Sequence, residues 1–303
     1  MAEYYKDFGD YMAEKFPGIK VQKISVNAGF SCPNRDGTIG RGGCIYCDNS
    51  SFTPGYCFSN ESISSQLNAG KAFFARKYPK MKYLAYFQSF SNTFGRPVEE
   101  LELMYREAMN VEDVVGVIIG TRPDTLPQET VGMLGRLNKE MPVIVEIGAE
   151  TSHDATLELI NRGHSWRDVE DAVKRLHEAG LSTGLHLIAG LPGETPEMML
   201  ETVRKGVALP IDSIKLHHLQ ILKNTRLAQL WESGKLSVEQ FTVEKYIDLC
   251  IKIINLVPRK IAIERFLASS PPDKVISPHW GLKNHEFTNI LKNRLKQNKI
   301  KRE

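Results

Sequence analysis

The chain contains 303 residues, of which 42% are hydrophobic and 25% are charged, and its formal net charge is +3. This composition is ordinary for a globular protein and excludes a charge-rich disordered chain. The first eleven residues have no apolar core, so they do not resemble a secretory signal, and no apolar run is long enough to span a bilayer. We therefore expect a cytoplasmic protein with no membrane partner.

Predicted strands and helices alternate through the first two thirds of the chain. A short helix is expected over residues 3–15, before the first strand. The predicted strands cover residues 21–26, 83–88, 114–120, 143–147, 181–189 and 211–217, and the predicted helices cover 61–78, 98–109, 126–139, 154–160, 166–179 and 195–208. This alternation predicts an α/β fold with a parallel sheet, either barrel-like or doubly wound.

The alternation weakens after about residue 225. Two helices (225–233 and 238–256), a strand (260–266) and a proline-rich stretch are expected before a basic terminal helix. We divide the chain into a core over residues 1–224 and an α-rich C-terminal extension over residues 225–303. The last 21 residues carry seven Lys or Arg and two acidic residues. This charge suits contact with nucleic acid, but it suits a solvated helix at least as well.

Four of the five cysteines lie within 26 residues, and this clustering indicates a metal or redox site. Eleven residues separate Cys32 from Cys44, and two separate Cys44 from Cys47, directly after the first predicted strand. In parallel α/β folds that end of a strand carries the chemistry. Three thiolates can hold three irons of a four-iron cluster and leave the fourth iron open. The alternative is a structural zinc site that also uses Cys57, since zinc accepts four thiolates and the Cys-x-x-Cys spacing.

The run KISVNAGFSCPNRDGTIGRGGCIYC, residues 23–47, resembles the radical S-adenosylmethionine (SAM) superfamily. Its three cysteines follow the first strand, and an aromatic residue, Tyr46, precedes the last. The long first gap is similar to the branch of the elongator catalytic subunit and the oxygen-independent coproporphyrinogen oxidases. The run also resembles a small bacterial radical SAM family tied to tRNA wobble-uridine modification. The resemblance implies a partial (β/α)6 TIM-like barrel, a 4Fe-4S cluster on the three cysteines, and bound SAM.

The same resemblance implies an activity and a set of partners. Reduced by flavodoxin or ferredoxin, the cluster would cleave SAM to a 5′-deoxyadenosyl radical. The substrate would be tRNA whose wobble uridine carries a 5-carboxymethylaminomethyl group. Loss of the carboxymethyl part would leave the aminomethyl form for a separate methyltransferase. Two alternatives stay open: a radical SAM enzyme that acts on a small molecule, and a non-catalytic zinc- or nucleic-acid-binding protein.

Polar residues near the predicted strand ends are candidates for binding SAM. Period two places Glu146, Gly148 and Glu150 on one face of the strand VIVEIGAE, where carboxylates need a partner. We favour a ligand role for Glu150, whereas Glu146 is equally a structural carboxylate. The full set of candidates, partly carried over from the resemblance, is Gln88, Ser89, Asn92, Arg122, Glu150, Arg162, His186 and Gly190.

Each of these candidates also has a plainer interpretation. The first three form a polar turn, and either arginine suits the SAM carboxylate or an ordinary ion pair. Gly190 lies in LHLIAGLPGET, a segment that the resemblance places beside the adenine. His217 shares its strand face with Lys215, which predicts an interior position, but a lone histidine is more often an ordinary core residue. No catalytic residue is assigned.

Overall fold

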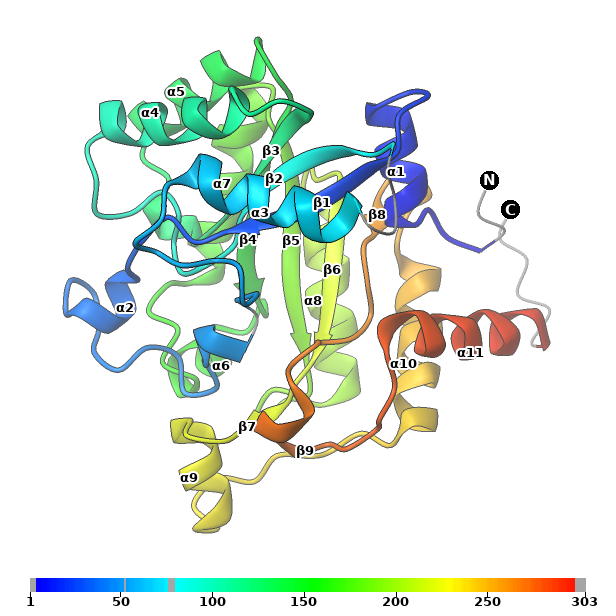
Figure 1. The fold of residues 1–303 in the computed structure, drawn as a ribbon. Helices are drawn as coiled ribbons and strands as arrows, with labels where there is room; N and C mark the ends of the chain where they lie inside the picture. The colour runs from blue at the N-terminus through cyan, green and yellow to red at the C-terminus, as the bar shows by residue number, and fades with distance from the viewer. Residues whose placement is uncertain (1–3, 52, 76–79, 298–303) are drawn as a thin grey trace.

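The computed structural model describes residues 4–51, 53–75 and 80–297. Among these residues, seven parallel strands form one sheet in the order β1-β2-β3-β4-β5-β6-β8, and β7 pairs with β9 in a separate antiparallel ribbon. The strands are β1 (Val21–Val26), β2 (Lys82–Phe87), β3 (Val114–Thr121), β4 (Val143–Glu150), β5 (Ser182–Ala189), β6 (Ser213–His218), β7 (Ile221–Leu222), β8 (Ala262–Ile263) and β9 (Val275–Ser277). The sheet curls into a half-barrel, which confirms the predicted partial barrel (Figure 1).

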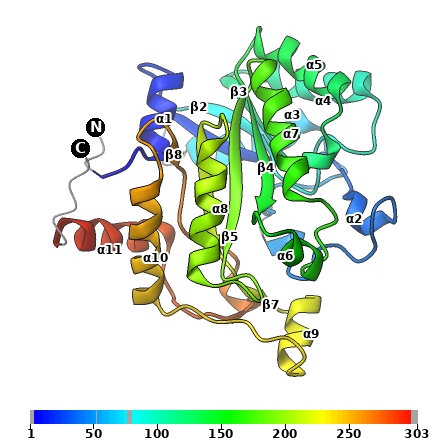
Figure 2. The ribbon, with the colours of Figure 1, turned by 180° about the vertical axis from the view of Figure 1, so that it is seen from behind.

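Helices cover the outer face of the curled sheet, as the two opposite views show (Figures 1 and 2). The helices are α1 (Phe8–Lys15), α2 (Pro33–Asp36), α3 (Ile63–Ala75), α4 (Val98–Met109), α5 (Gln128–Asn138), α6 (Asp154–Leu159), α7 (Trp166–Glu178), α8 (Pro196–Ala208), α9 (Arg226–Glu232), α10 (Val243–Leu256) and α11 (Asn284–Gln297). Local sequence fixes several helix starts: Thr195 caps α8 with Pro196 at the first helical position, and Thr242 caps α10. That second cap makes α10 begin five residues later than the sequence predicted.

The C-terminal segment completes the sheet. The predicted strand over 260–266 is reduced to β8, which pairs in parallel with β6 and is the seventh strand. Helix α10 packs beside α8, and α11 buries Phe287, Leu291 and Leu295 in the core. The basic residues Lys299, Lys301 and Arg302 of the predicted terminal helix lie outside the described residues.

The inner face of the half-barrel changes character along each strand. Near the strand starts, inward side chains such as Leu84 and Ile144 pack with Tyr11, Met12 and other residues of the α1 region. Two residues further along, the inward side chains on the same two strands are Tyr86 and Glu146, because successive side chains on one face lie two apart. The apolar layer therefore closes one end, and polar groups face a cavity at the other.

The strand arrowheads point toward the edge where α2, α6, α9 and the β7–β9 ribbon lie (Figure 1). Connections that follow the strands thus surround one opening. No helix within the described ranges is long and apolar enough to cross a membrane.

Candidate functional site

A cavity of about 260 Å³ opens at the carboxyl ends of the strands. The cysteine loop lines one side, and side chains from the strand interiors line its floor. The residues around it include Cys32, Arg35, Cys44, Tyr46, Cys47, Tyr86, Gln88, Arg122, Glu146, Glu150, Arg162, His186, Lys215, His217 and Arg265. Residues from both ends of the chain thus face one space.

The cysteine loop is held by its own backbone and by two later segments. Pro33 begins the short helix α2, and Gly37, with φ of 99°, ends it in a conformation that glycine adopts readily. The Gly43 amide donates to the Asn34 carbonyl at 2.8 Å. Ile45 then donates its amide to Ile160 after α6 and accepts from Leu227 in α9. These bonds hold the segment from Cys44 onward against the barrel.

The three cysteines of the sequence motif line the same cavity, and their surroundings fit a 4Fe-4S cluster. The guanidinium of Arg162 donates to the Cys44 sulfur at 3.5 Å, and the Asn34 amide approaches it at 3.8 Å. Donors to sulfur stabilise thiolate ligands and tune a cluster. Burial and the neighbouring Cys44 raise the pKa of Cys47 to about 12. Binding to iron would supply the positive charge that this thiolate needs.

Cys57 does not join the other three. Its thiol donates to the Ser25 carbonyl at 2.9 Å, and Cys57 is absent from the cavity lining. Across the described ranges, no three His, Cys, Asp or Glu side chains converge on a point where one metal ion could sit. The thiolates of a four-iron cluster bind different irons, so they need no such convergence. The placement of Cys57 argues against the four-cysteine zinc alternative.

Arg162 and Glu150 form an ion pair at the cavity wall, with 3.1 Å between Nη2 and Oε1. Glu150 has φ of 65°, a conformation that non-glycine residues rarely adopt, at a register shift between β4 and β5. A Cβ on Gly148 would lie 2.5 Å from Arg162 Nη2, so only glycine leaves room for the guanidinium. The Gly148 carbonyl accepts from the same nitrogen at 2.7 Å. The end of β4 is therefore shaped around Arg162.

Arg122 lines the cavity, but its donors have protein partners. It forms two hydrogen bonds to Asp124, at 2.9 and 2.7 Å, and a third to the Arg162 carbonyl at 2.8 Å. Its side chain is 2% exposed. This arrangement supports the position of Arg162 and leaves little donor capacity for a SAM carboxylate.

The three candidates at the end of β2 separate in the structure. Gln88 lines the cavity and accepts from the Ser25 hydroxyl at 3.1 Å. Ser89 and Asn92 are buried away from it. The Asn92 amide donates to the carbonyls of Phe87 and Gly120, at 3.0 and 2.8 Å, and so ties the ends of two strands. The Asn92 amide therefore has structural partners within the protein, and Asn92 does not line the cavity.

Gly190 is also outside this cavity. It has φ of 84°, and a Cβ there would meet the ring of Phe241 at 3.1 Å. Gly190 lines a separate small depression beside Phe241 and Trp280. Packing against Phe241 therefore explains why this position has no side chain. His186 and His217 do line the main cavity, as the strand parity of His217 predicted.

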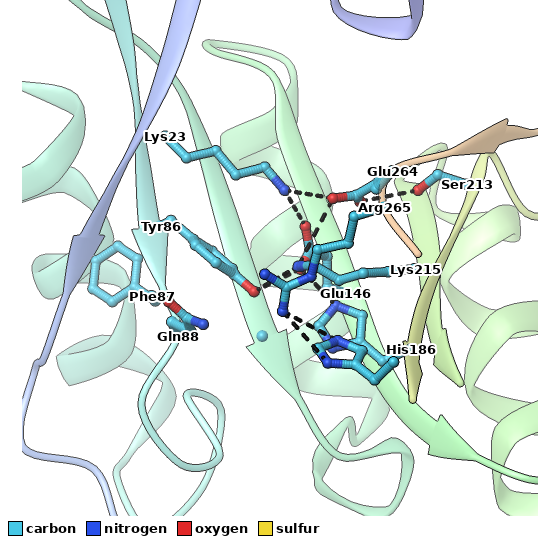
Figure 3. Close-up of polar contacts among 12 residues, drawn as sticks. Lys23, Tyr86, Phe87, Gln88, Glu146, His186, Ser213, Lys215, Glu264 and Arg265 are labelled. Atoms are coloured by element: carbon cyan, nitrogen blue, oxygen red, sulfur yellow. Dashed lines mark hydrogen bonds and ion pairs between the residues drawn. The ribbon is translucent and has the colours of Figure 1, made fainter. Parts of the chain in front are cut away.

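Charged side chains converge at the floor of the cavity (Figure 3). We call this set the charge cluster; it consists of Lys23, Tyr86, Glu146, His186, Lys215 and Glu264. Glu146 is its centre: one oxygen accepts from Lys23 at 2.6 Å, and the other accepts from Tyr86 and Lys215 at 2.7 Å and from His186 at 2.6 Å. Glu264 accepts from Lys23 at 2.8 Å and lies 3.8 Å from Lys215.

The cluster fixes the charge states of its members. Burial alone would raise the pKa of Glu146, but Lys215 and Lys23 outweigh it and hold this pKa well below its usual range. Burial lowers the pKa of Lys215 to about 8. Burial and the nearby Lys215 also lower the pKa of His186, so its ring is neutral and donates its Nε2–H to Glu146.

The sequence did not predict Lys23, Tyr86, Glu264 or Arg265 for this site. Tyr86 and Arg265 line the cavity, whereas Lys23 and Glu264 contact residues of its floor. Lys23 is a single charge within a strand, and Glu264 and Arg265 are adjacent charges directly after an apolar strand, and that is the signal that was available. Glu146 was left undecided between ligand and structural carboxylate, and the structure shows it bonded to four protein side chains.

Comparison with known proteins gives two family matches. The model described as the Radical SAM superfamily matches residues 36–206, and the Radical_SAM C-terminal domain matches residues 211–297. The protein YtqA of Bacillus subtilis is 34% identical over 291 residues, which cover 96% of this chain and 89% of YtqA.

More distant relatives cover smaller shares of longer proteins. A tRNA uridine(34) acetyltransferase of Methanocaldococcus jannaschii is 23% identical over 190 residues, or 62% of this chain and 34% of that protein. The solved structure of the archaeal Elp3 of Methanocaldococcus infernus superposes with a TM-score of 0.71 at 18% identity. That superposition covers 93% of this chain and 64% of the other, and it shows the shared fold.

Proposed function

This chain belongs to the radical SAM superfamily, whose cofactors are a 4Fe-4S cluster and SAM, and from that premise we propose that it modifies a wobble uridine of tRNA. Specifically, the reaction removes the carboxymethyl part of 5-carboxymethylaminomethyluridine and leaves the aminomethyl form. The observation that carries the enzymatic assignment is the cavity that combines three cysteines with a strand-borne polar floor.

Cys32, Cys44 and Cys47 would hold the cluster, and Glu150, Arg162 and Gln88, which line the same cavity, would contact SAM. When bound, the two cofactors supply a 5′-deoxyadenosyl radical that abstracts hydrogen from an unreactive carbon. The chain's own part is to position and shield. Arg162 donates to the Cys44 sulfur while Arg122 holds the Arg162 backbone. Buried side chains around the cavity limit access of water to the reacting groups.

Three observations support tRNA as the substrate. The motif resembles a family tied to wobble-uridine modification, and a partial relative is named for tRNA uridine(34). Lys283, directly before the C-terminal helix α11, and Lys296, near its end, are exposed basic side chains, which suit a phosphate backbone. Flavodoxin or ferredoxin would supply the electron, and a separate methyltransferase would use the aminomethyl product.

The test is an anaerobic assay with two readouts. The reconstituted protein is incubated with SAM, dithionite and tRNA bearing 5-carboxymethylaminomethyluridine at the wobble position. Mass spectrometry then measures 5′-deoxyadenosine and the aminomethyl nucleoside. We expect both products from the wild type and neither from Cys44→Ala, which removes a cluster ligand.

Cys57→Ala is the matched control, because it removes a nearby thiol that faces the Ser25 carbonyl and not the cavity. It should keep its iron and both products. Formation of 5′-deoxyadenosine without any change in the tRNA would redirect the proposal to a small-molecule substrate. Tightly held zinc and no cluster in the wild type would overturn the enzymatic proposal.

The role of the basic tail, residues 283–303, in tRNA binding is tested by replacing its charges. Truncation is unsuitable, because α11 buries Phe287, Leu291 and Leu295. Lys283→Gln combined with Lys296→Gln should weaken tRNA binding and flatten its dependence on salt. Unchanged binding with unchanged salt dependence would remove the tail from the tRNA interface.

A further inference from the structure

One cation of the cavity floor has no anionic partner. Lys215, Arg265 and Glu146 line the floor of the cavity, and Lys23 and Glu264 lie beside it and pair with Glu146 and Lys215. This region therefore holds three cationic side chains and two carboxylates. Both carboxylates contact both lysines. Within the described ranges, no carboxylate forms an ion pair with Arg265, and its Nε is buried without a hydrogen-bond partner. Among the described residues, Arg265 is therefore the one cation of this region that forms no ion pair with a carboxylate.

The contact of Arg265 with His217 does not satisfy the guanidinium. Its Nη2 lies 3.4 Å from Nδ1 and 3.3 Å from Nε2 of that imidazole. A hydrogen bond to a ring nitrogen lies in the ring plane and favours one nitrogen, whereas near-equal distances to both place the donor over the ring face. The guanidinium thus stacks on His217. Burial and the Arg265 charge hold the pKa of His217 well below its usual range, so the ring stays neutral.

The position of this guanidinium suits an anionic ligand. Arg265 lines the same cavity as the three cysteines, and Lys215 adds a second cation beside it. Stacking on His217 orients the planar fork, and an oriented fork binds a carboxylate through two parallel hydrogen bonds. A partly buried guanidinium without a carboxylate partner keeps a costly uncompensated charge, so an anion beside it would be favourable.

We propose that Arg265, stacked on His217, binds the carboxylate of the substrate's carboxymethyl group. This assignment rests on the proposed function and deepens it, because it names the group by which the cavity recognises its substrate. Binding the end of the uridine substituent draws the carbons between the carboxylate and the base into the cavity that also holds the cysteines. The same contact discriminates against uridines whose substituent lacks a negative charge.

The experiment measures binding and not turnover. Two anticodon stem-loops are compared, one with 5-carboxymethylaminomethyluridine and one with its neutral carboxamide analogue, by fluorescence anisotropy with the reconstituted, unreduced protein and SAM. The wild type should bind the carboxylate loop about 10- to 100-fold more tightly, as expected for charge-assisted hydrogen bonds. Arg265→Gln should bind both loops with the affinity that the wild type shows for the carboxamide loop.

Arg35→Gln is the matched control, since Arg35 is the exposed arginine on the cysteine side of the same cavity. It should keep the preference for the carboxylate loop. Loss of that preference in Arg35→Gln but not in Arg265→Gln would overturn the assignment. If Arg265→Gln weakens SAM binding but keeps the loop preference, the assignment is also overturned. That result would indicate that Arg265 binds the carboxylate of SAM.

Circular dichroism and thermal unfolding check that Arg265→Gln is folded. Arg265→Lys, which keeps the charge but not the planar guanidinium, should retain part of the preference for the carboxylate loop.

Failure of the proposed function would give a different set of results. In that case the wild type binds the two loops equally and forms no aminomethyl nucleoside from the carboxylate loop. If the wild type forms that nucleoside and Arg265→Gln keeps the full preference, only the carboxylate site fails.

Discussion

The cysteine side and the floor of the cavity are built in different ways. The cysteines lie on a loop whose backbone is held by hydrogen bonds to Ile160 and Leu227, and a bound cluster would fix the spacing of their thiols. The charge cluster lies on strands, and its members fix one another through contacts of 2.6 to 3.8 Å. A loop suffices where a cofactor imposes the geometry, whereas buried charges need rigid elements that keep them paired.

This difference also predicts where the molecule is sensitive. Removing a charged member of the charge cluster leaves an uncompensated charge in the interior, with a large effect on stability. Changing the cysteine side should affect the cofactor first and the fold less. The following predictions test that division, from the largest expected effect to the smallest.

Glu146→Ala should destabilise the fold by about 3–5 kcal/mol, because it leaves the buried ammonium groups of Lys23 and Lys215 without their central partner. Urea unfolding monitored by circular dichroism measures this change. The control is Glu140→Ala, which breaks an exposed pair with Arg106 and should cost about 1 kcal/mol or less. Equal losses in the two variants would contradict the central role of Glu146.

Lys215 should make stability depend on pH. Its pKa is about 8 in the folded protein against an ordinary 10.5, so between these values the unfolded chain binds a proton that the folded chain does not. The free energy of unfolding should therefore rise with pH from about 8 toward 10, by as much as ~3 kcal/mol over the full interval from this group.

Urea unfolding at several pH values between 7.5 and 9.5 tests this sign. Lys215→Met removes the titrating group and should flatten the rise. Burial opposes the charge of Lys23, but Glu146 and Glu264 outweigh it and raise the pKa of Lys23 above its usual range. Lys23 therefore titrates above this pH range and does not contribute to the predicted rise. A wild-type curve that is flat, or a slope retained in Lys215→Met, would refute the assignment.

Gly148→Ala should disturb the cysteine side with a modest effect on the fold. The new Cβ would lie 2.5 Å from Arg162 Nη2 and 2.9 Å from Glu150 Oε1, so the ends of these two side chains must shift. We expect a loss of about 1–3 kcal/mol and faster loss of iron to a chelator. Gly132→Ala on α5, with open space around its Cβ, is the control and should change neither. Unaltered iron retention in Gly148→Ala would argue against a role for Arg162 at the cluster.

Much of the fold and part of the site could be predicted from the sequence. Six strands were placed by their apolar runs, because strand and helix periodicities are local properties. Cys32, Cys44 and Cys47 were found together because their spacing is a short-range pattern. Glu150 and Arg162 were also chosen for the cavity that they line.

The sequence could not show the partners of residues that contact a distant segment. Asn92 follows a strand like any ligand in such a fold, but its amide bonds two strand ends, and only the position of β3 reveals this. Gly190 resembles a site for close cofactor approach, yet Phe241 from the C-terminal segment packs against it. A polar or flexible residue at a strand end does not specify which neighbour it will contact.

The sequence alone determined the alternation of strands and helices and the cysteine motif, because both depend only on residues that are close together in the chain. Tertiary structure decided the charge cluster and the unpaired Arg265. Lys23 and Glu264 lie 241 residues apart and meet because β1 and β8 sit at opposite edges of a sheet that curls. When a strand is buried on both faces, its sequence does not reveal which face lies inside the barrel. Only the curled sheet therefore shows that these charged side chains lie on the same inner face.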